Sequence, residues 1–485
     1  MDPKNFLFIL SDQHHRRFSG TYGHPCVETP NLDALAARGT RFENAYTNCP
    51  ICVPSRASLA TGRYVHDINF WDNGHPYDGS VPSWHARLRE QEVLCESIGK
   101  LHFKGLGVDH GFCNEIEPLH VVDGIGDVLG CIRTNPPVRD KVQELRTAGG
   151  GDSSYLKYDA RCATHARNWI KDHRNHEKPW ALFLNFVCPH PPYIGPIEFY
   201  NKYKNMDFPL PPQWEPTNWP THPAIEEFRR FFSFTDGHTE ESVRRVSSAY
   251  MATISFLDQQ IGAVMTELQQ CGLAEETCIV YSSDHGECLG ARGLFGKFTL
   301  YDEAAAIPLV MAGPGVPSNK VVHTPVSLVD IFPTAIDCVG ANLVDEGLPG
   351  SSLFKIANNS NTNTERTVLS EYHALGSTDA VFMLRQNRYK FIYYVNGPPQ
   401  LFDLEKDPLE LQNLSIKKKY SNLTMSLEKH LRTILDPEEV NRRAHKSQET
   451  LITASGGVEI IRAKGAFDNS PTPGENPNYR IHKKS

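Results

Sequence analysis

Polar side chains that can bind a metal ion follow two apolar stretches of this sequence. Asp12 and Gln13 come directly after the first stretch, and Asp284 and His285 come directly after a later one. Two carboxylates, an amide oxygen and one imidazole form a ligand set that suits a hard divalent cation. Ca²⁺ is the first expectation for such a set, with Mn²⁺ and Mg²⁺ as alternatives. An Asp after a strand is also a common turn former or helix cap, so each residue taken alone indicates little.

A cysteine at position 52 offers a second kind of chemistry. Cys49 and Cys52 form a C-x-x-C pair, which in an α/β protein can be a thiol redox site or half of a zinc site. Because both neighbours of Cys52 are apolar, it can equally be a small buried hydrophobic residue. A zinc site would need a second ligand pair, and a redox site does not require the Pro54-Ser55-Arg56 that follows. The redox, zinc-site and buried-residue interpretations of Cys52 therefore all stay open.

The elements that position these residues alternate along the chain. Three apolar runs read as buried parallel strands, at 5–10, 181–187 and 277–282, and three amphipathic patterns read as helices, at 30–38, 155–173 and 243–271. Strands alternating with helices predict an α/β fold with a large, mostly parallel sheet covered by helices on both faces. Polar residues just past the carboxyl ends of such strands converge on one crevice. His190 follows the second of these strands and is expected at the same edge.

The length of 485 residues predicts a large domain with a smaller companion. We expect an α/β catalytic domain over 1–365, after a polar linker at 358–364, and a small antiparallel α+β domain over 366–466. The second domain is predicted from two strands at 381–395, a third at 400–404 and a helix at 417–435.

Two further segments stand out by composition. Residues 203–234 form an insert rich in proline and aromatic residues, which predicts an ordered lid or pocket wall. Residues 467–485 form a polar, proline-rich tail, either disordered or an arm on a neighbouring subunit. We therefore expect a homo-oligomer, a dimer or a tetramer.

Charge and targeting signals restrict the class of partner. A formal net charge of -8 argues against nucleic acid or an anionic membrane, so an anionic substrate would need local Arg, Lys and His. The sequence as given has no signal-peptide pattern at its start and no apolar run long enough to cross a membrane. The twelve cysteines show no disulfide spacing. These features predict a cytoplasmic protein that acts on a small molecule.

The segment Cys52-Val53-Pro54-Ser55-Arg56, followed by Thr61-Gly62-Arg63, resembles the maturation signature of the type I sulfatases, members of the alkaline phosphatase superfamily. The resemblance covers nearly the whole chain and looks closest to the choline-sulfatase-like branch. The further segments that carry it are Asp12-Gln13, Gly99-Lys100-Leu101-His102, the loop around His190, Asp284-His285-Gly286 and Lys297. Ala60 departs from the pattern, where the family usually has Leu or Met.

The resemblance implies a fold, a modified residue and a reaction. It implies an alkaline-phosphatase-like fold in which a formylglycine-generating or other sulfatase-maturing enzyme oxidises Cys52 to formylglycine. The hydrate of that aldehyde attacks the sulfur of a small sulfate ester, and residue 52 joins the four metal ligands named above.

The resemblance also implies roles for five other side chains. Arg56 holds the hydrate, Lys100 and Lys297 bind the sulfate oxygens, and His190 protonates the departing alcohol. His102 then takes the proton whose removal expels sulfate.

More than one leaving group and more than one reaction class fit the sequence. The side chains expected to bind the leaving group are Trp71, Asp72, Asn73 and His75, which would suit choline, an aryl ring or a sugar. A phosphonate monoester or phosphodiester hydrolase on the same scaffold is the nearest alternative function. A thiol redox or binding protein that uses Cys49 and Cys52 is a more remote one.

Overall fold

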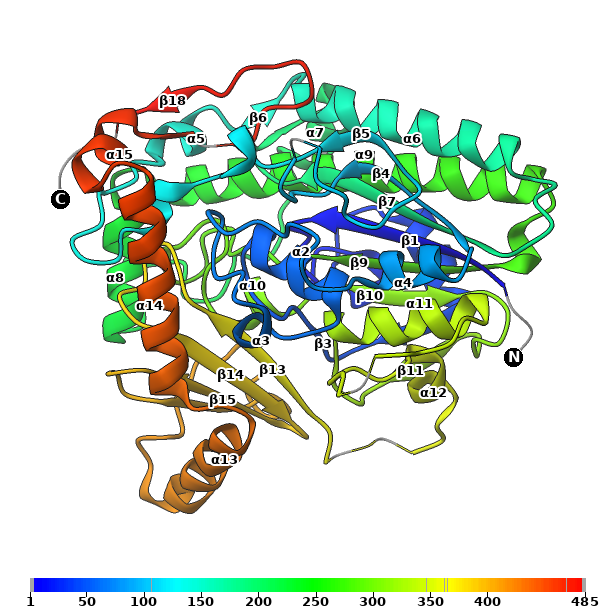
Figure 1. Ribbon diagram of the computed structural model, residues 1–485. Coiled ribbons are helices and arrows are strands. Elements are labelled where there is room, and N and C mark those ends of the chain that lie inside the picture. The colour runs from blue at the N-terminus through cyan, green and yellow to red at the C-terminus, as the bar shows by residue number, and fades with distance from the viewer. Residues whose placement is uncertain are drawn as a thin grey trace.

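An eight-stranded, mostly parallel β-sheet runs through the centre of the protein (Figure 1). The computed structural model describes residues 4–105, 107–345, 347–361, 363, 365–467 and 469–481. Among these residues, β10 is the strand of this sheet that runs antiparallel to its neighbours. In spatial order the strands are β11 (Lys320–Val322), β2 (Gly39–Phe42), β10 (Leu309–Ala312), β9 (Thr277–Ser283), β1 (Asn5–Asp12), β7 (Trp180–Pro189), β4 (Leu94–Lys100) and β5 (Asn114–Leu119).

Helices cover both faces of this sheet, because successive side chains of each strand point to opposite faces. In β1, Leu7 and Ile9 pack with α1 (Pro30–Ala37), α6 (Ser154–Asp172) and α9 (Glu240–Gln270). Phe6, Phe8 and Leu10 pack on the other face with α2 (Cys52–Thr61), α4 (Trp84–Glu90), α11 (Ile331–Val339) and α12 (Leu353–Asn358). The predicted α/β fold with helices on both faces is confirmed.

The register of the central strands brings their carboxyl ends to one edge. In the β1–β9 pair Ser11 lies opposite Ser283, and in the β1–β7 pair Asp12 lies opposite Pro189. The residues that follow these strands therefore meet at one place, as expected for a parallel sheet.

A four-stranded antiparallel sheet follows in the C-terminal part of the chain (Figure 1). Its strands are β13 (Thr367–Tyr372), β14 (Val381–Gln386), β15 (Tyr389–Tyr394) and β16 (Gln400–Asp403). The predicted hairpin is present, with Asn387 in the left-handed region at φ 49°. The helices after the sheet are α13 (Ser421–Ile434), α14 (Pro437–Ala454) and α15 (Val458–Lys464).

One hydrophobic core joins this second sheet to the rest of the protein. Val246 and Tyr250 of α9 belong to the same buried cluster as Phe382 and Met383 of β14. Packed side chains thus cross the predicted domain boundary at residue 365. The division of the chain into two domains at this residue stays a prediction. In the predicted linker 358–364, positions 362 and 364 lie outside the described residues.

Two segments are more regular than their composition predicts. The insert 203–234 contains the helix α8 (Pro223–Phe232), which starts at a proline because the first helical position needs no N–H donor. The tail folds back onto its own chain, where β17 (Ala466–Phe467) pairs with β18 (Tyr479–Arg480), at the top of Figure 1. Positions 468 and 482–485 of the tail lie outside the described residues.

The remaining elements are short. They are β3 (Ala45–Tyr46), α3 (Val65–Ile68), α5 (Val142–Arg146), β6 (Gly149–Gly150), β8 (Ile194–Gly195), α7 (Ile197–Tyr203), α10 (Asp302–Ala305) and β12 (Val326–Ser327). Among the described helices, none combines the length and the apolar character that crossing a bilayer requires.

Candidate active site

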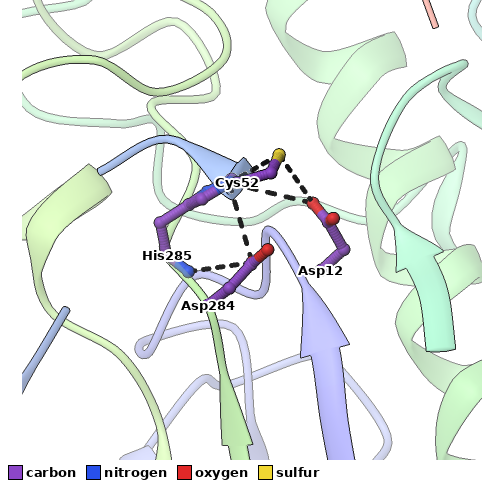
Figure 2. Close-up of side chains that lie close together, drawn as sticks. All are labelled: Asp12, Cys52, Asp284 and His285. Carbon is purple, nitrogen blue, oxygen red and sulfur yellow. Dashed lines mark hydrogen bonds and ion pairs between the residues drawn. The ribbon is translucent and has the colours of Figure 1, made fainter. Parts of the chain in front are cut away.

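Cys52 is the first residue of α2 and points toward the ends of β1 and β9 (Figure 2). The Asn73 side chain accepts a hydrogen bond from the backbone N–H of Val53 at 3.2 Å and so caps the first turn of the helix. The Ser55 hydroxyl donates to the backbone carbonyl of Asp284 at 2.7 Å. These two bonds fasten the start of the helix, and with it Cys52, to the strand-end crevice.

Three predicted metal ligands meet around the thiol of Cys52. Asp12, Cys52, Asp284 and His285 each offer a ligand atom, and these atoms lie within 4.8 Å of one another (Figure 2). The Cys52 Sγ lies 3.2 Å from His285 Nε2 and 3.7 Å from Asp12 Oδ1. The sequence prediction that two distant strand ends and Cys52 share one site agrees with this geometry.

The tautomer of His285 supports a cation at this place. Its Nδ1 donates to the carbonyl of Gly286 at 3.0 Å, so the neutral ring directs its Nε2 lone pair into the cluster. Nε2 lies 3.6 Å from Asp284 Oδ1 and 3.8 Å from Asp12 Oδ1. Burial and the nearby charge of Lys297 lower the pKa of His285, which keeps the ring neutral. A lone pair that faces two carboxylates is favourable when a cation lies between them.

Gln13 is oriented for the same site by its neighbours. Its backbone is left-handed, at φ 69°, and its N–H donates to Asp284 Oδ1 at 3.0 Å. Its Oε1 accepts from Lys297 Nζ at 2.7 Å, while its Nε2 donates to the buried carboxylate of Glu287. Glu287 therefore fixes the amide with its oxygen toward the site. The sequence alone did not lead us to predict a role for Glu287, although Glu287 lies three positions after Asp284.

Arg56 joins the carboxylates of Asp12 and Asp284. Its Nε donates to Asp284 at 2.9 Å and its Nη2 donates to Asp12 at 3.2 Å. Its Nη1 donates to the backbone carbonyl of Lys100 at 2.6 Å and to Asn185, which the sequence reasoning also missed. With its side chain only 2% exposed, Arg56 acts here as a brace for the ligand set.

Two lysines make the site cationic. Lys100 Nζ lies 2.6 Å from Asp12 Oδ2, and Lys297 Nζ lies 3.1 Å from Cys52 Sγ. Burial alone would raise the pKa of Asp12, but the charges of Lys100, Arg56 and Lys297 hold it well below its usual range. The side chains of Asp12 and Asp284 thus face the three buried cationic groups of Arg56, Lys100 and Lys297, which favours the binding of an anion.

A cavity of about 80 Å³ opens from Cys52 between these groups. Its lining includes Lys100, His102, His190 and Lys297, so the structure brings together the predicted anion-binding and proton-transferring side chains. Further lining residues are Asn73, Asp127, Arg139, Lys141, Phe232, Phe298, Leu375, Phe467, Asn469 and Ser470. A larger cavity, of about 820 Å³, is bordered by residues 15–18 and 408–409 and does not include Cys52. The smaller cavity is therefore the candidate site, because Cys52 and the predicted anion-binding and proton-transferring side chains line it.

The two histidines of the cavity are both neutral but have different partners. His190 Nδ1 donates to the carbonyl of Pro191 at 2.7 Å, which leaves Nε2 for a ligand. His102 Nε2 lies 2.7 Å from Ser470 Oγ of the tail, and its buried Nδ1 has no partner. Burial, together with Lys297 for His190 and Lys100 for His102, lowers the pKa of both rings well below the usual range. The contact with Ser470 is one that the sequence reasoning did not predict.

Of the four side chains predicted to bind the leaving group, the structure places one at the described lining of the cavity and three elsewhere. Asn73 lines the cavity, whereas its described lining does not include Trp71, Asp72 or His75. Asp72 accepts from His75 Nδ1 at 2.8 Å and from Gln448 Nε2 at 2.7 Å. Trp71 is buried in the core shared with the C-terminal sheet. These three residues therefore connect their segment to α14 and the core, and do not form the cavity wall.

Comparison with protein families identifies the chain. The family described as Sulfatase matches residues 4–341, and that described as N-sulphoglucosamine sulphohydrolase, C-terminal, matches residues 290–436. The chain belongs to the sulfatase family. It is thus a member of the type I sulfatases of the alkaline phosphatase superfamily, and the resemblance predicted from the Cys52 segment is confirmed.

Curated relatives of this sulfatase-family protein cover most of its length. Arylsulfatase K of Bos taurus is 29% identical over 469 residues, which are 92% of this chain and 84% of the relative. Choline-sulfatase of Rhizobium meliloti (strain 1021) is 32% identical over 429 residues, which are 85% of this chain and 82% of the relative.

Solved structures share the fold. BT4656, solved with its substrate D-glucosamine-2-N,6-O-disulfate, has a TM-score of 0.72 at 21% identity and covers 92% of this chain and 99% of that one. The phosphonate monoester hydrolase of Agrobacterium radiobacter has a TM-score of 0.71 at 22% identity and covers 89% and 95% of the two chains.

Proposed function

We propose that the protein hydrolyses a sulfate ester to an alcohol and inorganic sulfate, using a nucleophile made from Cys52. The observation that carries the proposal is the position of Cys52 Sγ, 3.1 Å from Lys297 Nζ and 3.2 Å from His285 Nε2, beside the carboxylates of Asp12 and Asp284. Oxidation of Cys52 to formylglycine by a maturing enzyme would supply a hydrated aldehyde as the nucleophile.

The side chains that would hold a divalent cation are Asp12, Gln13, Asp284 and His285, together with residue 52. Three of them offer oxygen atoms, which favours Ca²⁺, with Mn²⁺ and Mg²⁺ as alternatives. When bound, the cation supplies Lewis-acid stabilisation of negative charge. Arg56 keeps the two carboxylates in place, through bonds of 2.9 and 3.2 Å.

The substrate anion is bound by Lys100 and Lys297, whose ammonium groups both border the cavity. A sulfate ester repels nucleophiles because it carries a negative charge, and fixed cations in a buried site reduce that barrier. Both side chains are nearly buried, at 1% and 7% exposed, so bulk water screens them little.

The two histidines handle protons at different atoms. His190 presents Nε2 to the cavity, and we assign the role of acid to its protonated form, in which Nε2 carries the proton that the leaving alcohol needs. His102 has Nε2 engaged by Ser470, so its unpartnered Nδ1 is the nitrogen that we assign to taking the proton of a hydroxyl on residue 52.

The thiol redox alternative finds no support in the electrostatics. Burial, aided by Asp12, raises the pKa of the Cys52 thiol to about 11. Burial and the Glu371 carboxylate raise the pKa of Cys49 well above its usual range. Reactive redox cysteines need the opposite shift, because the thiolate is the nucleophile.

A phosphonate monoester or phosphodiester hydrolase is the second candidate function. Two phosphonate monoester hydrolases share the fold, with TM-scores of 0.71 and 0.69 at 22% and 24% identity. Lys100 and His102 favour sulfate, because they belong to the Gly99-Lys100-Leu101-His102 segment that carries the resemblance to the sulfatases. A panel of choline sulfate, aryl sulfates, sulfated sugars and a phosphonate monoester distinguishes the two, and the highest kcat/KM decides.

The cavity favours a small leaving group. Its volume is about 80 Å³, and Phe232, Phe298 and Phe467 border it together with the ion pair of Asp127 and Arg139. Aromatic faces and a carboxylate suit a quaternary ammonium, and the aromatic faces also suit an aryl ring. Choline sulfate and a small aryl sulfate are therefore the substrates to compare first.

The central experiment is a mass analysis of the peptide that contains residue 52. Protein co-produced with a formylglycine-generating enzyme should carry an aldehyde there, seen as a mass change and by hydrazide capture. The Cys52→Ala variant should show neither the aldehyde nor activity, and Cys49→Ser is the matched control that should keep both. Fully active protein that contains only unmodified Cys52 would rule the proposal out.

A further inference from the structure

Two histidines and a glutamate gather at the edge strand of the large sheet, in a cluster that the proposed reaction does not use. His110 lies in the loop before β5, Glu115 lies on β5, and His120 directly follows it. His110 Nδ1 lies 2.8 Å from Glu115 Oε1, and His120 Nε2 lies 3.1 Å from Glu115 Oε2. A ligand atom from each residue lies within 4.8 Å of the others.

Hydrogen bonding fixes which nitrogen of His110 faces the glutamate. Its Nε2 lies 2.8 Å from the backbone carbonyl of Lys104 and donates to it. In the neutral ring Nδ1 then carries the lone pair, and this lone pair points at a carboxylate oxygen 2.8 Å away. Such a contact is repulsive unless a proton or a metal cation lies between the two atoms.

The surroundings of His110 suit a bound metal cation. The His110 side chain is 1% exposed and is held in place by its neighbours. The bond from Nε2 to a backbone carbonyl is also the outer arrangement that metal-binding histidines have in proteins, because it fixes the tautomer. The rings of Tyr77 and Phe103, with centroids 6.0 and 5.3 Å from that of His110, form an apolar wall.

The other two residues, His120 and Glu115, leave one side of the cluster open to solvent. The side chains of His120 and Glu115 are 20% and 21% exposed, so solvent and ions can reach them. The Nδ1 of His120 is buried without a partner, while Nε2 faces the glutamate.

We propose that His110, Glu115 and His120 bind a Zn²⁺ ion. Two imidazole nitrogens and one carboxylate are three protein ligands of the type that zinc takes in open sites, with a fourth position for water. Ca²⁺ and Mg²⁺ prefer six or more oxygen ligands, so they suit this cluster less well than the oxygen-rich site at Cys52. The protein would then carry two metal sites of different selectivity.

The position of this cluster gives the zinc ion a function. The backbone N–H groups of Leu101 and His102 donate to the carbonyl of Leu119 at 3.2 and 2.8 Å, and Val121 donates to Phe103 at 3.0 Å. His120 lies between these two bonding positions, and His110 holds Lys104 in the same loop. A zinc ion would therefore stabilise the segment that follows Lys100 and carries His102, whose backbone is left-handed at φ 56°.

The test measures zinc, not turnover. Purified full-length protein is stripped with a chelator, loaded with Zn²⁺ alone, passed through a desalting column and analysed for metal. Wild type and Asp284→Ala should both retain one equivalent of Zn²⁺ that His120→Ala and Glu115→Ala lose. His165→Ala, which removes an exposed imidazole from α6, is the matched control and should retain it. Loss of one ligand should weaken binding by more than the roughly tenfold to hundredfold that loss of an outer partner costs.

A second readout separates metal binding from folding. Zn²⁺ should raise the Tm of wild type and of His165→Ala but not that of the cluster variants, because a ligand that binds the native state stabilises it. Should His120→Ala fail to fold, His120→Gln keeps the size of the side chain and removes the imidazole. Equal zinc content in wild type and the cluster variants overturns the proposal. So does the loss of all zinc from Asp284→Ala, since that would place the ion at Cys52.

Discussion

Asp284 joins the residues that we propose as metal ligands to the cationic residues around them. Its Oδ1 accepts from the backbone N–H groups of Gln13 and His285, at 3.0 and 2.9 Å, and its Oδ2 accepts from Arg56 Nε at 2.9 Å. One side chain thus orders the end of β1, the end of β9 and the start of α2.

Replacing Asp284 by Ala should remove both the activity and the cation bound beside residue 52, whereas a Zn²⁺ ion at His110, Glu115 and His120 should stay. The change takes away a ligand and leaves Arg56 with less compensation for its buried charge. If the cation supplies several kcal/mol, turnover should fall by about a thousandfold or more. Metal analysis and turnover with an aryl sulfate check this, with the exposed Asp152→Ala as the control that keeps both. A variant with stoichiometric metal and nearly normal turnover would show that the ligand assignment is wrong.

His190→Ala should slow esters with poor leaving groups far more than activated aryl esters. Only the poor leaving groups need a proton in the transition state, and such assistance is worth about a hundredfold to ten-thousandfold. Since burial and Lys297 lower the pKa of His190, its protonated fraction grows as the pH falls. In wild type, kcat/KM for alkyl esters should therefore rise toward acidic pH. The pH profiles of two esters, one of each kind, measure this effect, and equal slowing of both by His190→Ala would contradict the role.

Among the elements, those with local signals could be predicted from the sequence. The strands β1, β7 and β9 are continuous apolar runs, and the hairpin of β14 and β15 has turn residues between its strands. Because parallel strands end at one edge, the meeting of Asp12 and Asp284 also followed. Glu287 could have been found, since a carboxylate three residues after Asp284 lies in the same loop.

Other features depend on tertiary packing that no local pattern encodes. The contact between His102 and Ser470 joins residues 368 positions apart, and a polar, proline-rich tail carries no periodic signal for it. Trp71, Asp72 and His75 were expected at the substrate because an aromatic side chain and an acid would suit the leaving group. Their burial against α14 and the core depends on the position of a helix that the sequence reasoning did not place there.

The tail contributes a side chain directly to the candidate site, and one substitution tests this contribution. Ser470 bonds His102 through its hydroxyl, and its carbonyl accepts from the Tyr155 hydroxyl at 2.6 Å. Ser470→Ala removes one hydrogen bond, worth roughly 1 kcal/mol, so kcat/KM should fall by about fivefold. Ser426→Ala on α13 is the control, because this serine is exposed. Unchanged kcat/KM in Ser470→Ala would mean that the tail only covers the cavity.

In the molecule as a whole, buried charges connect the catalytic sheet to the C-terminal one. Lys390 of β15 lies 2.8 Å from Asp302 and 2.7 Å from Glu410, and Asp302 also binds Arg16 at 2.9 Å. Together with the shared hydrophobic core, this network argues that the C-terminal sheet is required for the stability of the catalytic part.

Lys390→Met should destabilise the whole protein in a pH-dependent way. Removing one partner from a buried ionic network costs about 3–5 kcal/mol, because the remaining charges are left unpaired. Burial raises the pKa of Glu410 to about 7 even with Lys390 beside it, and the variant should raise it further. A carboxyl group with a raised pKa in the folded state takes up a proton on folding, so its contribution to stability falls as the pH rises.

The loss of Tm caused by Lys390→Met should consequently be larger at pH 8 than at pH 5, where Glu410 can be neutral. Thermal melts of the two proteins at both pH values measure this difference. Lys429→Met, which removes an exposed lysine from α13, should leave the Tm nearly unchanged. Two results would contradict this prediction: a Tm of Lys390→Met equal to that of the control, or an equal decrease in Tm at both pH values. Either result would mean that Glu410 and Asp302 find other partners and that the hydrophobic core joins the two sheets.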